Sequence, residues 1–534
     1  MRLAAAGHPT LRFDLPATGN SGGSTADEGV VDGWVAAVVA AASWLADESG
    51  TATVAAFGFG LGGLLAIAAA EAGAPIEELA VWGTPRDGSR FLRETRAFSL
   101  MQAWNSEDEA DFDAGVPDGW LEAGGFVLSP ATTRSLKSLA PGGGESTLRQ
   151  VLCLDRDGVA VDPKLVAALE VLAEEVEFAA GPGWGEFVSH PERSTVPLVV
   201  ARRLEAWLHA AQGRATTTPV TEIPDGSAPI EIGRDGTTET ALAIEQEWGR
   251  TVGVLAQPEG ERADLCAVFL NAGAVRMVGP SRLWTETARR WAGSGVPSLR
   301  IDLQGIGEAD GEAAGALRVG DFYVPRYIGQ VRAALDELQK RGLGDRFLLV
   351  GLCAGGYWAF QTAVADSRVV ASFCINAGAL RWDPDLLVRR EARKGGRAFD
   401  RRSWRKLLRG PVPWAKVGAL LRSLAIEFGR RLSAGLRRLV GRGADEGLKG
   451  GIEADLDALE RSGTSVLLAF SGKEPLGEEV AADGFADDPD HWPHADFADL
   501  PGNDHTLRPL SVQRDVRKLL DLKLEKLLDA DRGA

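Results

Sequence analysis

The chain has 534 residues, of which 45% are hydrophobic and 25% charged, values typical of globular proteins rather than of collagen, coiled coils or disordered chains. Its 58 basic and 75 acidic residues give a net charge of −17. Such a surface would repel a phosphate backbone, which argues against a general nucleic-acid binder. The length predicts two domains or three.

Nothing in the sequence predicts export or membrane insertion. The N-terminus lacks the pattern of a signal peptide, and the longest apolar runs, such as residues 30–45 and 58–70, are shorter than the ~20 residues that a membrane span needs. Four cysteines are too few for a disulfide framework and suit a reducing compartment: Cys153, Cys266, Cys353 and Cys374. We therefore expect a soluble, cytoplasmic protein.

The chain repeats itself with a period of about 290 residues. The segment LRFDL at residues 11–15 returns 288 positions later as LRIDL, followed in both places by a Gly-containing turn. The apolar run 54–59 with GLGG behind it returns 293 positions later as residues 347–352 with CAGG behind them. A period this long does not fit a solenoid, so we predict two copies of one domain.

The first copy is assigned to residues 1–211, with strands expected at 11–15, 54–59 and 151–154. Its first strand lies only ten residues from the start, so this copy lacks three strands and a loop that the second copy has. An incorrect start codon or a real truncation would give the same sequence. Residues 212–228, rich in Thr, Pro, Gly and Ala, are the expected linker.

The second copy, residues 229–534, alternates strand-like and helix-like segments. Strands are expected at 239–244, 251–256, 265–270, 299–303 and 347–350, and a helix at 326–343. Such alternation predicts a mostly parallel sheet covered by helices on both faces.

A strand–turn–helix motif in the second copy carries the strongest functional signal. The apolar strand that ends at Leu352 runs through Gly351-Leu352-Cys353-Ala354-Gly355 into a helical segment. In such a nucleophile elbow the two glycines prevent clashes at a sharp turn, and the thiol stands at a helix N-terminus that favours thiolate. The N–H of Ala354 is the expected first donor to an oxyanion. Cys353 as a small buried residue in an ordinary turn is the alternative.

With this motif the second copy resembles the α/β-hydrolases, and its Gly-x-Cys-x-Gly form resembles dienelactone-hydrolase-type members. The sequence Gly-Leu-Cys-Ala-Gly-Gly-Tyr, followed by residues 374–376 (CIN), resembles the sequences of hydrolases encoded with bacterial exopolysaccharide clusters. The resemblance implies two α/β-hydrolase-type domains in tandem, the first N-terminally truncated and the second with a helical lid insertion.

The family order of nucleophile, acid and histidine is present in the second copy. Glu474 follows an apolar strand at residues 465–470, and His505 lies in a loop before a helical segment. His505 would take the thiol proton or hold an imidazolium–thiolate pair, while Glu474 would orient its ring. Asp504, next to the histidine, is the other acid considered.

The second oxyanion donor should come from the loop after the third strand, where Gly273 and Ala274 are the candidates. A tight turn that merely needs Gly is the alternative. The turn at 305–311 fails the Gly-x-Gly-x-x-Gly form, so no dinucleotide is expected. The six histidines show no ligand spacing, so no metal and no other cofactor is expected.

The first copy has Gly60 where the second has Cys353. Asp157 and His190 keep an acid-to-histidine interval of 33 residues, against 31 for Glu474 and His505. Without a nucleophile this copy is expected to pack, pair or bind rather than catalyse.

An insertion at about residues 381–455 of the second copy is basic and helical. Residues 381–442 hold fifteen Arg and three Lys against five acidic residues, a net charge of +13. Two interpretations stay open. It binds anionic membranes or the phosphates of an acyl carrier, or it is a solvated lid whose arginines pair with the acidic body.

The sequence thus predicts an esterase or thioesterase that acts on a small-molecule or carrier-bound acyl substrate through Cys353, His505 and Glu474. Two alternatives remain: an acyltransferase that passes the acyl group to a glycan, and a non-catalytic scaffold.

Overall fold

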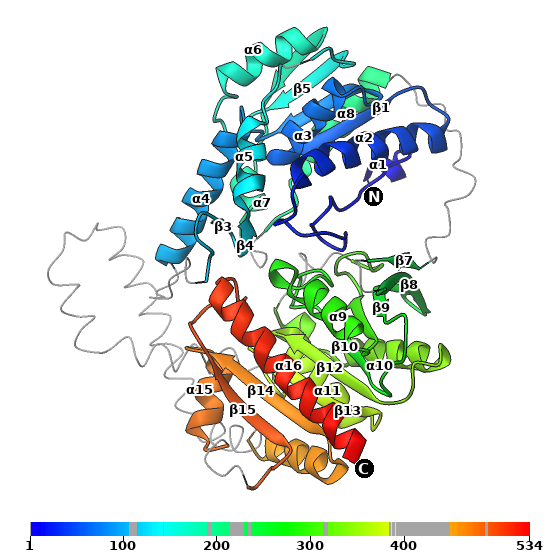
Figure 1. Ribbon diagram of the computed structural model, residues 1–534, viewed down its shortest axis with the longest axis vertical. Coiled ribbons are helices and arrows are strands. Elements are labelled where there is room, and N and C mark those ends of the chain that lie inside the picture. The colour runs from blue at the N-terminus through cyan, green and yellow to red at the C-terminus, as the bar shows by residue number, and fades with distance from the viewer. Residues whose placement is uncertain are drawn as a thin grey trace, which may run out of the picture.

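The structure is a computed structural model that describes residues 2–105, 115–142, 144–189, 194–212, 229–232, 236–312, 319–383, 386, 390, 449–485 and 490–533. Figure 1 shows two α/β bodies, one above the other. We call the described residues up to 212 the first body and those from 229 the second body.

The first body is built on a four-stranded parallel sheet with the order β1-β2-β5-β6. Its strands are β1 (Val54–Phe59), β2 (Ile76–Trp82), β5 (Gln150–Leu154) and β6 (Glu175–Ala179), with a hairpin of β3 (Leu121–Ala123) and β4 (Phe126–Leu128) beside it. Its helices are α1 (Arg2–Ala5), α2 (Val30–Ser49), α3 (Leu61–Glu71), α4 (Gly88–Asn105), α5 (Pro130–Ser138), α6 (Pro163–Leu172), α7 (Trp184–Phe187) and α8 (Leu198–Gln212).

The second body is built on a nine-stranded sheet with the order β15-β14-β13-β12-β10-β11-β9-β8-β7. The strands are β7 (Ile230–Glu231), β8 (Thr238–Gln246), β9 (Gly249–Gln257), β10 (Cys266–Phe269), β11 (Ser298–Asp302), β12 (Phe347–Leu352), β13 (Val369–Ile375), β14 (Ser465–Ser471) and β15 (Ala495–Leu500). The pairs from β11 to β15 are parallel, and β9 and β8 join antiparallel. The strand order reverses at β10, which lies between β11 and β12, and ligands bind at such switch points in open α/β sheets.

Helices cover both faces of the second sheet because its central strands are apolar on both faces. Every residue of β10, β11 and β12 is buried. One face packs against α10 (Pro325–Lys340), α11 (Ala354–Ala365) and a helix at residues 449–462, and the other against α9 (Leu283–Gly293) and α16 (Leu510–Gly533). Continuous apolar strands of this kind are typical of parallel sheets buried on both sides. The described part also contains α15 (Pro475–Ala482) and two 3-10 turns, Pro280–Arg282 and Val319–Phe322.

The first sheet is covered less completely. Helices α2, α3 and α6 pack on one face, and α8 with α7 packs on part of the other. Strand β1 is the edge of its sheet among the described residues, and Phe57 and Phe59 on it are 45% and 49% exposed. The matching strand β12 is fully buried in the second body.

The prediction of a strand at residues 11–15 is wrong, because this segment forms no strand in the structure. A strand needs a neighbour to accept its backbone hydrogen bonds, and no described strand lies beside these residues. The turn that follows nevertheless matches its counterpart. Thr18 N–H donates to Leu15 O as Ile306 N–H donates to Leu303 O, 288 positions later.

The two elbows match in the same detail. Gly60 has φ 55° and ψ −128°, and Cys353 has φ 59° and ψ −120°. Gly60 N–H donates to Trp82 O, and Cys353 N–H donates to Ile375 O, with donor and acceptor both shifted by 293 positions. Both preceding strands also have a register shift after their first residue.

One described helix, α2, is long and apolar enough to cross a membrane by length and composition. It has 20 residues, and its most apolar stretch has a mean hydropathy of 1.4. This differs from the expectation that no apolar run reaches that length. The helix lies against α3 and the first sheet, and core helices of globular proteins pass the same test.

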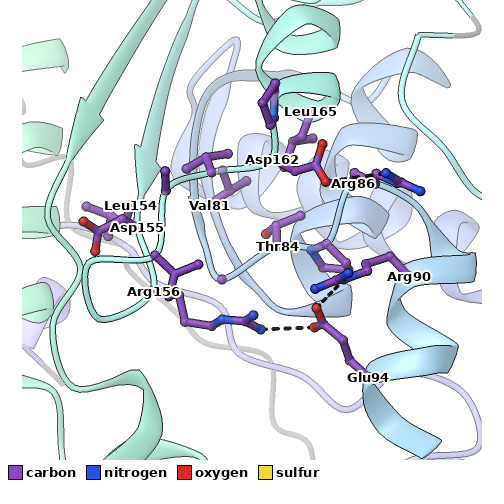
Figure 2. A pocket seen from close by; sticks show the side chains of 16 residues that line it. Val81, Thr84, Arg86, Arg90, Glu94, Leu154, Asp155, Arg156, Asp162 and Leu165 are labelled. Carbon is purple, nitrogen blue, oxygen red and sulfur yellow. Dashed lines mark hydrogen bonds and ion pairs between the residues drawn. The ribbon is translucent and has the colours of Figure 1, made fainter. Parts of the chain in front are cut away.

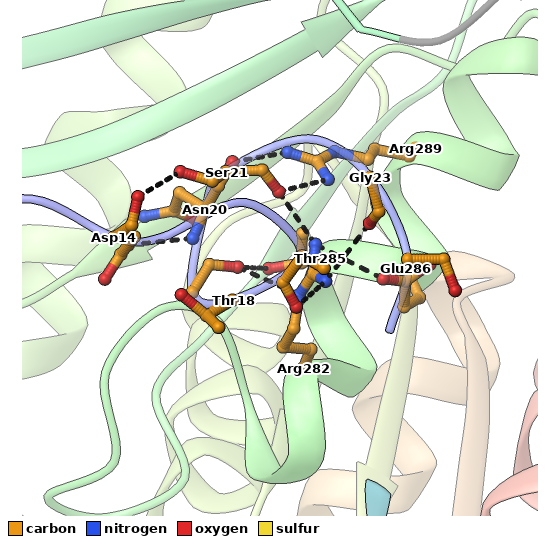
Figure 3. A network of polar contacts seen from close by, with 12 residues as sticks. Asp14, Thr18, Asn20, Ser21, Gly23, Arg282, Thr285, Glu286 and Arg289 are labelled. Carbon is orange, nitrogen blue, oxygen red and sulfur yellow. Dashed lines mark hydrogen bonds and ion pairs between the residues drawn. The ribbon is translucent and has the colours of Figure 1, made fainter. Parts of the chain in front are cut away.

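Arginines of the second body hold the turn at residues 17–23 of the first (Figure 3). The buried guanidinium of Arg282 donates to the carbonyl oxygens of Ala17 at 2.6 Å and Ser21 at 2.9 Å, and also reaches the carbonyls of Gly19 and Gly23. Five donors in a rigid fork suit such a set of carbonyls, which an ammonium group could not span.

One pair of contacts between the bodies joins matching positions. Arg300 donates to the Asn20 side chain at 3.3 Å, and Arg12, 288 positions before Arg300, pairs with Glu308, 288 positions after Asn20.

We predict that Arg282→Ala lowers the free energy of unfolding by about 2–4 kcal/mol, because it leaves several carbonyl oxygens without a donor and removes a buried side chain. Urea denaturation followed by fluorescence measures the loss. Arg250→Ala is the control, since Arg250 pairs with Asp310 in an exposed salt bridge and should cost less than about 1 kcal/mol. Equal losses in the two variants would contradict a clamp at Arg282.

Candidate active site

Cys353 stands at the tip of a sharp turn between β12 and α11. Its φ of 59° lies in the left-handed region, which non-glycine residues rarely adopt, and such strain is common at functional sites. The turn is tightly packed. A Cβ added to Gly351 would overlap the backbone of Gly355, and one added to Gly355 would overlap the carbonyl of Asn271. The sequence requires both glycines because strand, helix and neighbouring loop meet here.

The structure brings His505 and Glu474 to this turn from far along the chain. Glu474 lies one residue before α15, just after β14, and its Oε1 is 2.8 Å from Nδ1 of His505. The Cys353 side chain lies close enough to the His505 ring to raise its pKa. The structure therefore brings the three predicted side chains into one neighbourhood. The other described histidines take no part in it.

The protonation of His505 is set by its two partners. Burial opposes the charged imidazolium, but the hydrogen bonds to Cys353 and Glu474 and the charges of those side chains outweigh it and raise the pKa of His505 well above its usual range. Cys353 is partly exposed, whereas the other three cysteines are buried, and burial raises each of their pKa values to about 12. Of the four cysteines, only Cys353 combines partial exposure with a neighbouring histidine.

Asn376 positions the loop that carries His505, and the sequence analysis gave it no role. It is fully buried at the end of β13 with φ 43°, and its Nδ2 donates to the backbone carbonyl of His505 at 2.9 Å. Its Oδ1 accepts the N–H of Ser471 at 2.7 Å, which ties the end of β14 to the same point. The sequence feature that could have indicated this role is an Asn directly after an apolar strand.

Asp504 has a different role from Glu474. Its carboxylate accepts from the N–H of Thr506 at 2.8 Å and pairs with Arg508, so it shapes the His505 loop. Burial would raise the pKa of Asp504, but these partners lower it below the ordinary value. The sequence-based choice of Glu474 as the partner of the histidine agrees with this geometry.

The loop proposed for the oxyanion lies against the elbow. Gly273 has φ 56° in a turn where Val275 N–H donates to Ala272 O at 3.1 Å, and the preceding Asn271 carbonyl faces Gly355. Ala354 is the first residue of α11, so its N–H has no partner within the helix. The roles of Ala354, Gly273 and Ala274 as donors stay predictions.

A buried carboxylate holds this loop in place. Asp302, at the end of β11, accepts from Asn271 Nδ2 at 2.7 Å and from Met277 N–H at 2.6 Å. Burial raises the pKa of Asp302 to about 6, against the lowering effect of these donors. The oxyanion loop is thus fastened to the strand on its other side.

In the first body, Trp184 occupies the place that corresponds to the active site. Its ring lies 3.6 Å from where a Cβ at Gly60 would stand and crowds Gly83 beside it. The backbone bond Asp157 N–H to Gly181 O matches Gly472 N–H to Gly502 O, so Trp184, three residues after Gly181, matches His505. Asp157 accepts from the N–H of Gly183 and Gly185 and orients no histidine among the described residues. His190 lies outside the described residues.

The acid of the first body matches at Asp162 rather than at the predicted Asp157. Asp162 and Glu474 each precede the proline that begins the helix after the third parallel strand, counted from the strand before the elbow. Asp162 lines a polar pocket of about 270 Å³ (Figure 2). Its arginines are already paired, Arg90 and Arg156 with Glu94 at 2.6 and 3.1 Å and Arg86 with Asp162 at 3.7 Å. The prediction failed because spacing alone did not show where the helix begins.

The described residues contain no group of three or more His, Cys, Asp or Glu side chains that could hold a metal ion. Most of the basic insertion lies outside the described residues. Of its arginines, Arg381 pairs with Asp455 at 2.6 Å and Arg390 pairs with Glu479 at 2.8 Å. Arg381 thus pairs with an acid at the far end of the insertion, and Arg390 pairs with an acid of α15.

No protein-family model matches the chain, and no curated protein matches it in sequence. Solved structures match about half of the chain. They include an α/β serine hydrolase homologue from Coxiella burnetii, 12% identical with a TM-score of 0.32, covering 53% of this chain and 96% of that one. Another is the thioesterase domain of a curacin biosynthetic pathway, 15% identical with a TM-score of 0.31, covering 53% and 98%.

A third is Est1E from Butyrivibrio proteoclasticus with bound ferulic acid, 13% identical with a TM-score of 0.34, covering 54% of this chain and 99% of that one. The assignment of the fold rests on the strand order and on the elbow that follows β12. The second body has an α/β-hydrolase fold.

We predict that replacing Glu474 with Gln lowers the pKa of His505 towards the ordinary value, because the carboxylate favours the charged imidazolium and an amide does not. The imidazolium then loses its proton at a lower pH than in the unchanged protein. Nitrogen-15 NMR of the histidine rings measures the titration, with His505→Asn to assign the resonance. His494→Asn is the control, since His494 pairs with Glu460 away from the site. Titration of His505 near pH 6.5 in the unchanged protein would contradict the geometry.

Proposed function

We propose that the second body hydrolyses a carboxylic ester or thioester with Cys353 as the nucleophile. The observation that carries this proposal is that His505, hydrogen-bonded to Glu474, lies beside Cys353 at the head of α11. A thiol in this position can be deprotonated by the imidazole and is stabilised as thiolate by the helix N-terminus.

In the first half-reaction the Cys353 sulfur attacks the carbonyl carbon, and the thiol proton resides on His505. The carbonyl oxygen becomes an oxyanion that Ala354 N–H and an N–H of the Gly273–Ala274 turn would stabilise. When the tetrahedral intermediate collapses, the bond to the alcohol or thiol breaks, and His505 donates the proton to that leaving group. A thioester to Cys353 remains.

In the second half-reaction His505 takes a proton from water, and the hydroxide attacks the thioester carbonyl. Collapse of this second intermediate breaks the carbon–sulfur bond, releases the carboxylic acid and returns the thiolate paired with imidazolium. Glu474 keeps the imidazole ring in place through both steps and remains a carboxylate.

Esters and thioesters suit this site better than amides do. The attacking thiolate is itself a good leaving group, so the intermediate returns to substrate unless the competing group leaves as readily. An alkoxide assisted by His505, or a thiolate, meets this requirement, whereas an amine does so poorly. A small-molecule or carrier-bound acyl group is therefore the proposed substrate. A free catalytic thiol also favours a reducing compartment such as the cytoplasm.

We also propose that the first body is a duplicate of the second that has lost this chemistry. The equal offsets of the backbone hydrogen bonds at the turns and at both elbows support a duplication. At the elbow Gly60 supplies no nucleophile, and Trp184 takes the place of the imidazole.

The proposed function predicts hydrolysis of nitrophenyl esters and of acyl thioesters of graded chain length by the full chain. Cys353→Ala should lower kcat/KM by at least about 10³-fold, since removal of a nucleophile leaves only binding and oxyanion stabilisation. Cys153→Ala, a buried cysteine of the first body, is the matched control and should change the rate little. Full activity in Cys353→Ala would sink the proposal.

A further inference from the structure

An apolar groove of about 640 Å³ runs along the exposed edge of β1 in the first body. One wall is β1 itself, and the opposite wall is formed by Leu11, Phe13 and Leu15. The floor is provided by α2 and α3. Phe13 lines the groove with 43% of its surface exposed, and Phe57 and Phe59 of β1 are exposed to a similar degree.

The lining of this groove matches the core of the second body residue by residue. Leu11, Phe13 and Leu15 correspond, at the 288-residue offset, to Leu299, Ile301 and Leu303, which are fully buried. The floor residues of α2, at the 293-residue offset, correspond to buried apolar residues of α10: Val38, Ala41, Ala42 and Leu45 match Val331, Ala334, Leu335 and Leu338. The groove therefore has the lining of a hydrophobic core, but one of the elements that would fill this core is missing.

The second body shows what fills the matching space. Strand β10 lies between β11 and β12, and its residues Cys266 and Val268 pack in the same core as the residues just named. Leu270 N–H, directly after β10, donates to Val350 O at 2.9 Å. The Asn271 carbonyl that follows β10 lies against Gly355, whereas no atom of the described residues lies within 4 Å of a Cβ placed at the matching Gly62.

The edge of β1 offers the same hydrogen bonds that β12 gives to β10. Val54 N–H donates to Pro75 O, just before β2, and Gly60 N–H donates to Trp82 O at the end of β2. By strand alternation the N–H and C=O groups of Ala55, Phe57 and Phe59 therefore point away from β2, into the groove. Phe57 corresponds to Val350, whose carbonyl accepts from Leu270. Unpaired edges of this kind pair readily with a strand from elsewhere.

We infer that this groove binds an extended apolar β-strand of another polypeptide, which inserts between residues 11–15 and β1 as β10 does between β11 and β12. The inference rests on the proposed duplication and does not depend on the chemistry at Cys353. Main-chain hydrogen bonds to β1 provide affinity, and alternate side chains that enter the groove provide specificity. The partner segment is apolar on both faces, because Phe57 and Phe59 lie on the face opposite α2 and α3.

An acyl chain fits the apolar lining less well than a strand does. A hydrocarbon that filled the groove would separate the outward-pointing N–H and C=O groups of β1 from water without giving them hydrogen-bond partners, which is unfavourable for each group. A strand supplies N–H and C=O groups at the required spacing. It would also lie beside residues 11–15, which pair with no described strand.

The probe is a fluorescein-labelled peptide with the sequence of residues 264–271 and Cys266→Ser, that is, the strand that fills the matching space. We expect saturable binding to the full chain by fluorescence anisotropy. The same peptide with an N-methyl group on the residue equivalent to Leu270 should bind at least about tenfold more weakly, because it cannot donate to Phe57 O. Hydrogen exchange should slow in residues 51–60 and 10–16 when the unmodified peptide is bound.

The matched protein variants are Phe13→Asp at the groove and Val171→Asp on α6, where the side chain is 82% exposed. Phe13→Asp should weaken the peptide at least about tenfold, and Val171→Asp should leave it unchanged. Absence of saturable binding, equal binding of the N-methyl peptide, or binding of a fluorescent dodecanoate but not of the peptide would overturn the inference. So would a dimer of the chain that excludes the peptide.

Ester hydrolysis measured in the same preparations separates the two proposals. Phe13→Asp should hydrolyse esters at the rate of the unchanged chain, and Cys353→Ala should bind the peptide normally. Loss of peptide binding together with retained hydrolysis would leave the proposed function intact.

Discussion

The candidate active site depends on one backbone constraint, the left-handed conformation of Cys353 between β12 and α11. A non-glycine residue there costs about 1–2 kcal/mol, which the surrounding packing must provide. Gly351 and Gly355 let strand, helix and the Asn271 loop approach to van der Waals contact, which fixes the backbone that presents the thiol. Asn376 and Glu474 then bring the imidazole of His505 to that position.

The two bodies share part of this framework. The first body has the turn at residues 17–23, a left-handed elbow at Gly60 and the helix behind it. It has a glycine at the nucleophile position and Trp184 over it, and its edge strand β1 is uncovered. Arg282 donates hydrogen bonds to the backbone carbonyls of this turn, so the turn forms part of the contact between the two bodies.

The elbow and the pairing of Glu474 with His505 could be predicted because each of these residues follows a recognisable local pattern, an apolar strand followed by a turn or a helix start. The strand at residues 11–15 could not, since its pattern is that of β11 but its neighbour is lacking. Interval counting selected Asp157 and missed Asp162 and Trp184, because an extra turn lies between β5 and α6. The role of Arg282 was invisible because its partners are backbone carbonyls, which leave no side-chain pattern.

The most direct test of the central claim is the rate at which iodoacetamide alkylates each cysteine at neutral pH, mapped by peptide mass spectrometry and normalised to the unfolded chain. The account predicts that Cys353 reacts at least about tenfold faster than Cys153, Cys266 and Cys374, and that His505→Ala removes most of this advantage. A rate at Cys353 that equals those of the buried cysteines, or that is indifferent to the loss of His505, would contradict a nucleophile activated by its imidazole.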